Sequence, residues 1–478
     1  MTGPAPGRST LRVAGWADVE RPSRPPRQVT PDELLAVADS VVERARPGEE
    51  LEAVVTWSHD TEIRAADGEV EHFVESDAAG LGVRIIREGR TGMAWVGSLG
   101  DPAAIEECIA EARDNATFGT PDPDAGLARP DGVAVHHLDL FDERLERVAT
   151  ADKIELAVEL ERRILDADPR MVGLEASDYA DTIAAGAIAS TTGIRVAGAD
   201  TSAYVGAWAL AEDDSGTTTG FGFSVGRTTE DLLIEPAAAD AVRRCLTMLG
   251  ATKVPSERLT VVFDPYVTSQ FLGLVAELLS GEAVLRGRSA FAGRVGEVVA
   301  SPLVTLVDDP TDELAPSADD TDGEGLACRP VELLAGGVLQ GYLHNAYTAR
   351  ASGTMSTGSA QRGSHRSVPG VGPRVVKLLG GTGTADEVLA AVGDGLLVQE
   401  VSGLHSGVNP VSGDLSVGIE GVRIRGGETA ESVREVTIGS TLQRMLMDVE
   451  AVGGDLTYFP WDAAGVTLAI ADVTMSGT

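Results

Sequence analysis

The chain has 478 residues, of which 43% are hydrophobic but only 4% are aromatic, so its cores must be mainly aliphatic. This length predicts two or three domains rather than one. Lys and Arg number 38 against 74 Asp and Glu, which gives a formal net charge of −36 that is spread along the sequence. A chain this acidic repels phosphate backbones, so a general nucleic-acid-binding role is disfavoured.

The cysteines and the apolar runs indicate where the protein works. Three cysteines lie far apart and form no C-x-x-C pair, which argues against a disulfide framework and suits a reducing compartment. No apolar run approaches the ~18 residues of a membrane span, and the N-terminus has no signal-peptide hydrophobic region. The sequence therefore predicts a cytoplasmic protein with no membrane contact and a Pro-rich, disordered tail over residues 1–30.

Residues 31–228 have the pattern of an N-terminal α+β domain. Helices are predicted over residues 31–46, 101–115 and 150–167. The first helix has a capping box, because Thr30 precedes it and Glu33 follows three residues later. Residues 52–99 alternate as four strands, with hairpin turns at Asp67-Gly68 and Glu88-Gly89. Strands return over residues 171–225.

After residue 228 the pattern changes. Residues 229–256 are predicted to form a connecting helix and linker, and residues 257–478 a second domain. Short strands and glycine-rich turns dominate this domain, and a helix is predicted over residues 266–281. The acidic run at 307–325 lacks the fixed offsets of an EF-hand loop, so we interpret it as a solvated loop rather than a cation site.

The histidines show no zinc-ligand spacing such as H-E-x-x-H. His405 lies in the segment "SGLHSGVNPVSGD", close to Ser402 and Ser406, and Asp414 could supply the acid of a serine-hydrolase triad. There is no G-x-S-x-G elbow to support that hypothesis. The glycines and the Asn409-Pro410 turn signal favour a wide hairpin corner followed by a strand, with backbone groups able to receive another strand.

Several segments resemble the TldD/PmbA family of zinc peptidases and their partner chains. They are "LLVQEVSGLHSGVNPVSGDLSVGIEGVRIRGGE", "SAFAGRVGEVVASPLVTLVDDP", "EGLACRPVELLAGGVLQGYLHNAYTARASG", "STGSAQR" and "VTIGSTLQRMLMDVEAVGGDL". The similarity covers most of residues 35–478. It implies an α+β fold with an N-terminal antiparallel sheet covered by helices and a strand-rich, barrel-like C-terminal domain.

The zinc-binding members of this family, the TldD type, carry H-E-x-x-x-H on the first helix of the C-terminal half and a metal-binding cysteine near the end. When the sequences are aligned without gaps, "LGLVAE", Leu272 to Glu277, stands in the place of H-E-x-x-x-H. The closing segment "DLTYFPWDAAGVTL" has no cysteine. Glu277 and Glu282 remain, but carboxylates without imidazole or thiolate partners make a poor zinc site. The chain thus resembles the PmbA (TldE) type, so no catalytic residue, metal ligand or cofactor is expected in it.

The resemblance implies a non-catalytic subunit of a heterodimer, with zinc bound by a TldD-like peptidase partner. Its substrates would be unfolded proteins and small, leader-bearing peptides. The residues expected to contact peptide or partner are His405, Ser406, Asn409, Ser412 and Asp414. Two alternatives stay open. One is a homodimeric peptide-binding protein without a protease partner. The other is an active peptidase with an unrecognised site that uses His344, His405 and an acidic residue.

Overall fold

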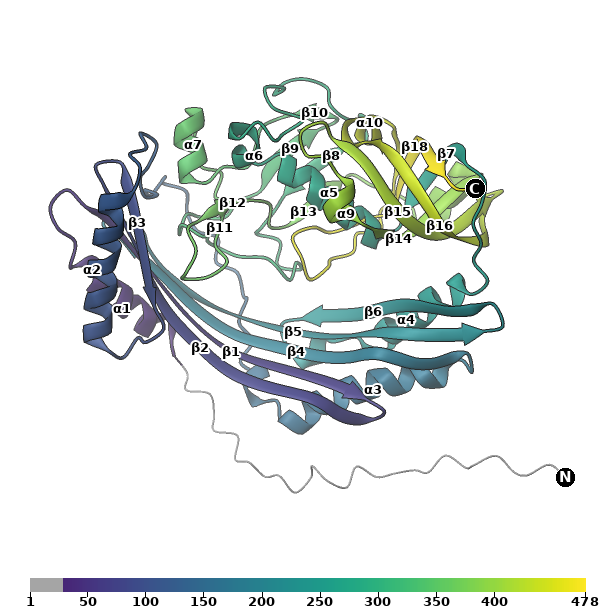
Figure 1. The fold of residues 1–478 in the computed structure, drawn as a ribbon, viewed down its shortest axis with the longest axis horizontal. Coiled ribbons are helices and arrows are strands. Elements are labelled where there is room, and N and C mark those ends of the chain that lie inside the picture. Colours follow the sequence, from purple (N-terminus) through teal and green to yellow (C-terminus); the bar gives the residue numbers. More distant parts are fainter. Residues whose placement is uncertain (1–28) are drawn as a thin grey trace.

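The computed structural model describes residues 29–478, so most of the predicted Pro-rich tail lies outside the described residues. A long curved sheet forms one layer, and a strand-rich domain lies over its concave face (Figure 1). The architecture is α+β, as the sequence predicts. None of the helices between residues 29 and 478 is long and apolar enough to cross a membrane.

The N-terminal layer is a six-stranded sheet in which each strand pairs antiparallel with its neighbours, in the order β3-β2-β1-β4-β5-β6. Its strands are β1 (Glu50–Ala66), β2 (Glu69–Arg87), β3 (Arg90–Val96), β4 (Met171–Ser190), β5 (Arg195–Asp213) and β6 (Gly216–Gly226). Its helices are α1 (Pro31–Val42), α2 (Pro102–Phe118), α3 (Thr150–Ala167) and α4 (Ile234–Met248), with short 3-10 turns at Leu145–Arg147 and Thr229–Asp231.

The helices pack an aliphatic core against one face of this sheet. Leu34 of α1, Ile109 of α2 and Leu160 of α3 are buried in the same cluster as Val55 of β1. Thr30 caps α1 through the predicted capping box with Glu33. The helix predicted as a connection, α4, also belongs to this core, because its alanines and Cys245 pack on β5 and β6.

Residues 52–99 contain three long strands rather than the four that the sequence predicts. The two predicted turns are confirmed: Asp67 and Glu88 adopt φ values of 54° and 52°, each followed by a glycine with positive φ. The fourth strand is wrong because β2 continues unbroken through Gly80 and Gly82. A Cβ at Gly82 would lie 1.8 Å from the carbonyl oxygen of His365, so these glycines give the C-terminal domain room to pack on the strand.

The C-terminal domain is strand-rich and closes into a barrel-like sheet of order β16-β15-β14-β7-β18-β17, in which β16 also pairs with β18. This sheet contains β7 (Glu257–Phe263), β14 (Gly395–Ser402), β15 (Asp414–Arg425), β16 (Glu428–Thr441), β17 (Val449–Val452) and β18 (Leu468–Ser476). A smaller sheet, β10-β9-β8-β13, contains β8 (Thr305–Asp308), β9 (Val331–Ala335), β10 (Val338–Leu339) and β13 (Val376–Leu379), and β11 (Ala360–Gln361) pairs with β12 (Gly370–Val371).

The helix α5 (Pro265–Leu278) is central to this domain. Phe271, Leu272 and Val275 on one of its faces are buried in the aliphatic core formed with the barrel strands. The other helices are α6 (Gly281–Leu285), α7 (Ala346–Ser352), α8 (Ala385–Val392), α9 (Leu404–Gly407) and α10 (Leu442–Met447). The opposite face of α5 is therefore free to line a cavity.

The acidic run at 307–325 corrects the sequence analysis. We expected a solvated loop, but Asp308, Asp322 and Glu324 are all buried. Backbone N–H groups satisfy much of the polar demand: those of Arg374 and Val375 donate to Asp308. Buried carboxylates need such partners, which a one-dimensional charge count does not reveal.

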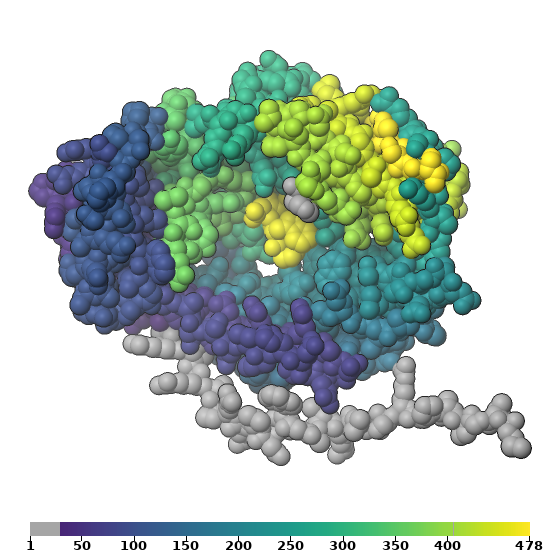
Figure 2. Space-filling model, in the orientation of Figure 1, coloured from purple at the N-terminus to yellow at the C-terminus, as the bar shows by residue number. Residues whose placement is uncertain are grey.

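Buried ion pairs join the two layers. Glu52 of β1 lies between the guanidinium groups of Arg84, 2.8 Å away on β2, and Arg362, 2.7 Å away in the C-terminal domain. Glu324 from the C-terminal domain lies 3.6 Å from Arg84. Burial raises the pKa of Glu52, but the two guanidinium groups outweigh it and hold this pKa below its usual range. The network fixes the strand-rich domain on the curved sheet, and Figure 2 shows an opening between the two layers.

Candidate functional site

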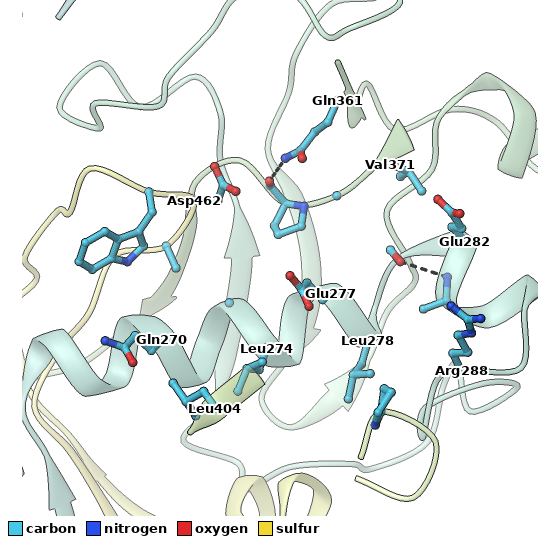
Figure 3. A pocket seen from close by; sticks show the side chains of 18 of the residues that line it. Gln270, Leu274, Glu277, Leu278, Glu282, Arg288, Gln361, Val371, Leu404 and Asp462 are labelled. Atoms are coloured by element: carbon cyan, nitrogen blue, oxygen red, sulfur yellow. Dashed lines mark hydrogen bonds between the residues drawn. The ribbon is translucent and has the colours of Figure 1, made fainter. Parts of the chain in front are cut away.

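A cavity of about 760 Å³ opens beside α5, at the side of this helix that does not face the core. The residues of α5 that line it are Tyr266, Ser269, Gln270, Gly273, Leu274, Glu277 and Leu278. Their spacing follows the helical period, so they form one continuous stripe. Segments from α6, from residues 361–373 and from residues 461–463 complete the wall (Figure 3).

The orientation of α5 decides whether residues in the place of the zinc motif face the cavity or the core. Leu272, which the ungapped register sets at the first imidazole position, is 1% exposed and packs in the core. A motif that turned its ligands into the cavity would begin at Ser269 or Gly273, and neither register supplies a histidine. The described cavity wall holds carboxylates but no imidazole or thiolate. No group of three or more His, Cys, Asp or Glu among residues 29–478 is arranged to hold a metal ion. This donor set does not fit zinc.

Two carboxylates, Glu277 on α5 and Asp462 on a loop, point into the cavity from different elements (Figure 3). Burial raises the pKa of Glu277. Burial also raises the pKa of Asp462, and the negative charge of Glu277 adds to this while Arg374 opposes it. A third carboxylate, Glu282, lies 2.7 Å from Arg286. Arg286 and Arg288 also line the cavity, so its acidic part is confined to Glu277 and Asp462. Protonation or a cationic ligand is favoured there.

Aromatic rings gather at one end of the cavity, although the chain has few of them. Trp461 stacks on Phe459 at 5.0 Å between ring centroids, and Tyr266 meets Trp461 edge-on at 5.7 Å. Phe221 and Phe223, from β6 of the curved sheet, touch this group at 4.5 Å from Tyr266 and 5.9 Å from Trp461. The cluster therefore joins the sheet to the cavity and offers flat apolar surface for a ligand chain.

Arg244 of α4 positions the first turn of α5. Its guanidinium group lies over the ring of Phe221 at 4.4 Å and forms a 3.0 Å ion pair with Asp264. Asp264 caps α5 by accepting a hydrogen bond from the N–H of Val267 at 2.9 Å. Burial raises the pKa of Asp264 to about 6, and the Arg244 charge opposes this rise. The linker region thus orients the cavity-lining helix through one charged contact.

The loop between β14 and β15, residues 403–413, separates this cavity from a second, open hollow of about 610 Å³. Leu404 and Pro410 line the cavity; Ser406, Asn409, Pro410 and Asp414 line the hollow. Asn409 organises the loop, because its side-chain oxygen accepts from the N–H of Val411 at 2.9 Å. The structure thus has the hairpin corner that the sequence predicts, at the rim of both concavities.

The predicted contact residues are brought together in part. The hydroxyl of Ser412 donates to Asp414 at 2.6 Å, and that of Ser406 donates to the carbonyl of Gly403 at 3.3 Å. His405 lies in α9, and its side chain is outside the described part of the structure. His344 is buried and shares a 3.1 Å hydrogen bond with Thr348. It lines neither of the two concavities.

Sequence reasoning missed the aromatic wall and the Glu277–Asp462 pair. The sequence indicates Glu277 only as a carboxylate that remains at the position of a zinc-binding helix, and it gives no signal for Asp462. One signal was available: "YFPW" at 458–461 concentrates aromatic residues in a chain that has only 4% of them. The partners of these residues on β6 and α5 could not be found, because the contacts span more than 180 positions of the chain.

Comparison with known proteins identifies three consecutive family domains. The PmbA/TldA metallopeptidase domain 1 matches residues 51–116, the central domain matches residues 143–249, and the C-terminal domain matches residues 256–477. Together these matches cover most of the chain.

Individual relatives agree with the domain matches. The metalloprotease PmbA of Escherichia coli is 26% identical over 406 residues, covering 85% of this chain and 87% of the relative. A metalloprotease TldD homologue of Haemophilus influenzae is 27% identical over 350 residues, covering 68% and 69%. The crystal structure of TldE from Thermococcus kodakarensis has the same fold, with a TM-score of 0.84, 22% identity and coverage of 93% and 99%. This chain belongs to the PmbA/TldD metallopeptidase family.

Proposed function

We propose that this chain is a non-catalytic, PmbA/TldE-type subunit of a heterodimeric metallopeptidase, and that a TldD-like partner carries the zinc. One observation carries the proposal: the cavity-facing stripe of α5 is built from Ser269, Gln270, Gly273, Leu274 and Glu277, with no imidazole. Water activation by zinc requires nitrogen or sulfur ligands around an open coordination site. A chain without these groups needs a partner that has them.

The proposed contribution of this subunit is to hold the substrate in an extended form. The cavity runs from the acidic lining at Glu277 and Asp462 to the aromatic group at Tyr266 and Trp461. Aromatic faces accept apolar side chains without regard to sequence, and carboxylates attract cationic ones. Both properties suit unfolded proteins and small, leader-bearing peptides. The cytoplasm is the proposed location, in keeping with three buried, unpaired cysteines.

Co-expression with a TldD-like chain of the same genome tests the proposal. Size-exclusion chromatography with light scattering should give a one-to-one complex, and elemental analysis should give about one zinc per complex and none in this chain alone. The complex should hydrolyse denatured casein, whereas each isolated chain should leave it intact. Replacing the glutamate of the partner's H-E-x-x-x-H motif by glutamine should abolish hydrolysis without affecting assembly.

Two results would contradict the proposal and point to the alternatives. Stable homodimers that bind peptide but do not associate with the TldD-like chain would favour the homodimeric peptide-binding protein. Stoichiometric zinc in this chain alone, with hydrolysis that is lost in His405→Ala, would favour an active peptidase with an unrecognised site. A Glu277→Gln, Asp462→Asn variant serves as the matched test of the cavity: it should assemble normally and lose affinity for cationic peptides.

A further inference from the structure

The β1–β2 hairpin leaves one edge of the curved sheet without a partner. Strand β2 pairs with β1 along its whole length, but β3 pairs only with Leu81–Arg87. Residues 69–79, which we call the free edge, therefore have a strand on one side only within the described chain. At ~3.4 Å per residue, the free edge offers roughly 35 Å of ladder. Figure 1 shows this hairpin on the outer rim of the sheet.

The free edge is exposed and partly apolar. Residues 71–78 are all exposed, including the aromatic ring of Phe73 and the side chain of Val74, at 37% and 36%. Soluble proteins usually cover such an edge, shorten it or twist it away with a bulge, because it can pair with any extended chain. Here the only irregularity in the pairing of β1 with β2 lies where Arg64 pairs with His72 and Ala65 with Val70, so it disturbs only one end of the free edge. The backbone N–H and C=O groups that point away from β1 are therefore in position to bind a further strand along most of the free edge.

The other end of the free edge is held firmly. His365, from the C-terminal domain, packs on Gly80 and shares a 2.8 Å hydrogen bond with Thr56. Arg366 lies over the ring of Trp95 at 4.2 Å, where β3 ends. The edge is thus fixed in direction before any ligand arrives, which lowers the entropic cost of adding a strand.

The charges of the free edge select its occupant. It carries Glu69, Glu71, Glu75 and Asp77 and no Lys or Arg. A second copy of this chain is a poor occupant: in the antiparallel registers centred on Phe73 or Val74, Glu71 would face Glu75 or Asp77 of that copy. Like charges opposite each other destabilise a strand pair, whereas Lys or Arg in those positions would stabilise it.

We propose that the free edge of β2 is a docking site for an extended, basic segment of another protein chain, which adds to the curved sheet as an antiparallel strand. Main-chain hydrogen bonds supply the affinity, and the acidic residues supply the preference for Lys and Arg. The site lies on the N-terminal layer, and its residues do not line the α5 cavity. The inference is thus independent of the proposed function.

A synthetic peptide tests this. The probe is fluorescein-labelled Lys-Val-Lys-Val-Thr-Val-Lys-Val-Lys, and fluorescence anisotropy with the full chain measures its dissociation constant. Two control peptides have the same length: one carries Glu in place of Lys, and one is N-methylated at alternate residues, which removes ladder donors but keeps the charge. The Lys peptide should bind, and both controls should bind at least about tenfold more weakly, a difference of ~1.4 kcal/mol. Amide hydrogen exchange of residues 69–79 should slow when the Lys peptide binds.

Paired variants locate the site. Glu69→Lys with Glu71→Lys reverses two charges at the free edge and should weaken binding of the Lys peptide by about tenfold or more. Glu107→Lys with Glu111→Lys makes the same charge change on the exposed face of α2 and should leave the constant within about twofold. Both variants should keep the urea midpoint of the parent chain.

Three outcomes would overturn the inference. Equal binding of the N-methylated peptide would mean that charge alone attracts the probe, with no strand addition. Equal weakening by the α2 variant would mean that the overall negative charge is responsible. A concentration-dependent dimer with protection of residues 69–79 and no binding of the Lys peptide would assign the edge to a second copy of the chain.

Discussion

Asp308 is a buried carboxylate whose surroundings shift its protonation. Asp308 is 1% exposed, and its Oδ1 accepts from the N–H groups of Arg374 at 2.9 Å and Val375 at 2.7 Å. Its Oδ2 is buried without a hydrogen-bond partner. Burial raises the pKa of Asp308 to about 6, and the nearby Asp462 adds to this, while the two N–H donors and Arg374 oppose it.

This shift predicts a pH-dependent stability that Asp308→Asn removes. An Asp in the unfolded chain has a pKa of about 3.9. Between that value and about 6 the folded chain binds the proton more tightly, so its stability falls as the pH rises through this window. Asparagine keeps the Oδ1 acceptor and carries no charge. The stability of the parent relative to the variant should therefore fall by about 1 to 2 kcal/mol from pH 5 to pH 8.

Urea unfolding at the two pH values measures this change. Asp386→Asn, at an exposed position in the first turn of α8, is the matched control for the Asp-to-Asn change itself. A difference for Asp308→Asn that does not depend on pH would show that Asp308 is ionised throughout this range.

At the scale of elements, local sequence signals predict well where contacts are local. The helix over 150–167 is found as predicted, and the turns at Asp67-Gly68 and Glu88-Gly89 form where the glycine of each pair adopts positive φ without strain. The sequence pattern predicts β2 wrongly, because its glycines suggest a break between two strands. In the structure these glycines leave room for a loop almost 300 residues away in the chain. The predicted connecting helix forms as α4, and its contribution to the N-terminal core depends on packing partners in β5 and β6 that lie outside its own sequence.

The same distinction applies to the candidate site. The glycines and the Asn-Pro turn predict the 403–413 loop, and Ser406 and Asn409 of this loop line the open hollow together with Asp414 at the start of β15. The sequence does not predict the cavity on α5, because helical periodicity shows which residues share a face but not which face is exposed to solvent. Only the contacts of Leu272 with the core decide that Ser269, Gly273 and Glu277 face the cavity.

Gly82→Ala should be one of the most damaging alanine substitutions in the curved sheet. The new Cβ would lie 1.8 Å from the backbone oxygen of His365, and a backbone atom cannot move aside as a side chain can. We expect a loss of about 2 kcal/mol or more in the free energy of unfolding. Gly198→Ala in β5 is the control, because its Cβ would meet nothing within 4 Å. That variant should match or slightly exceed the stability of the parent in the same urea titration.

A loss of stability in Gly82→Ala no larger than that in Gly198→Ala would contradict the proposed spacer role. Hydrogen exchange adds a second test: opening of the contact should expose amides near Gly80 and Thr56, where His365 packs.

At the scale of the whole molecule, the curved sheet and the strand-rich domain have separate cores, which two small apolar clusters, an aromatic group and a set of polar contacts join. The N-terminal core is built on α1–α4, and the C-terminal core on α5 and the barrel strands. Between them lie the aromatic group at Tyr266 and the buried network of Glu52 and Arg362. The position of the cavity relative to the sheet therefore depends on contacts that neither core makes alone.

Arg362→Met tests how strongly this network joins the two layers. The guanidinium group donates to Glu52 at 2.7 Å, and to the carbonyl oxygens of Gly323 at 2.9 Å and Ser367 at 2.7 Å. Methionine fills similar volume but leaves the buried Glu52 with one cation instead of two. Breaking a buried ion pair on one side costs about 3 to 5 kcal/mol, so the free energy of unfolding should fall by that amount. Tryptophan fluorescence during urea unfolding measures it.

Arg425→Met removes an exposed guanidinium that pairs with Glu431 and should cost far less than Arg362→Met, because solvent screens that pair. The two variants change the net charge equally, so a difference between them measures the effect of burial.

Because the network joins two separate cores, Arg362→Met should also split the unfolding curve, with the curved sheet and the barrel unfolding at different urea concentrations. A single transition with a loss below about 1 kcal/mol would mean that the other contacts between the layers, such as the aromatic group and the small apolar clusters, hold them together without Arg362.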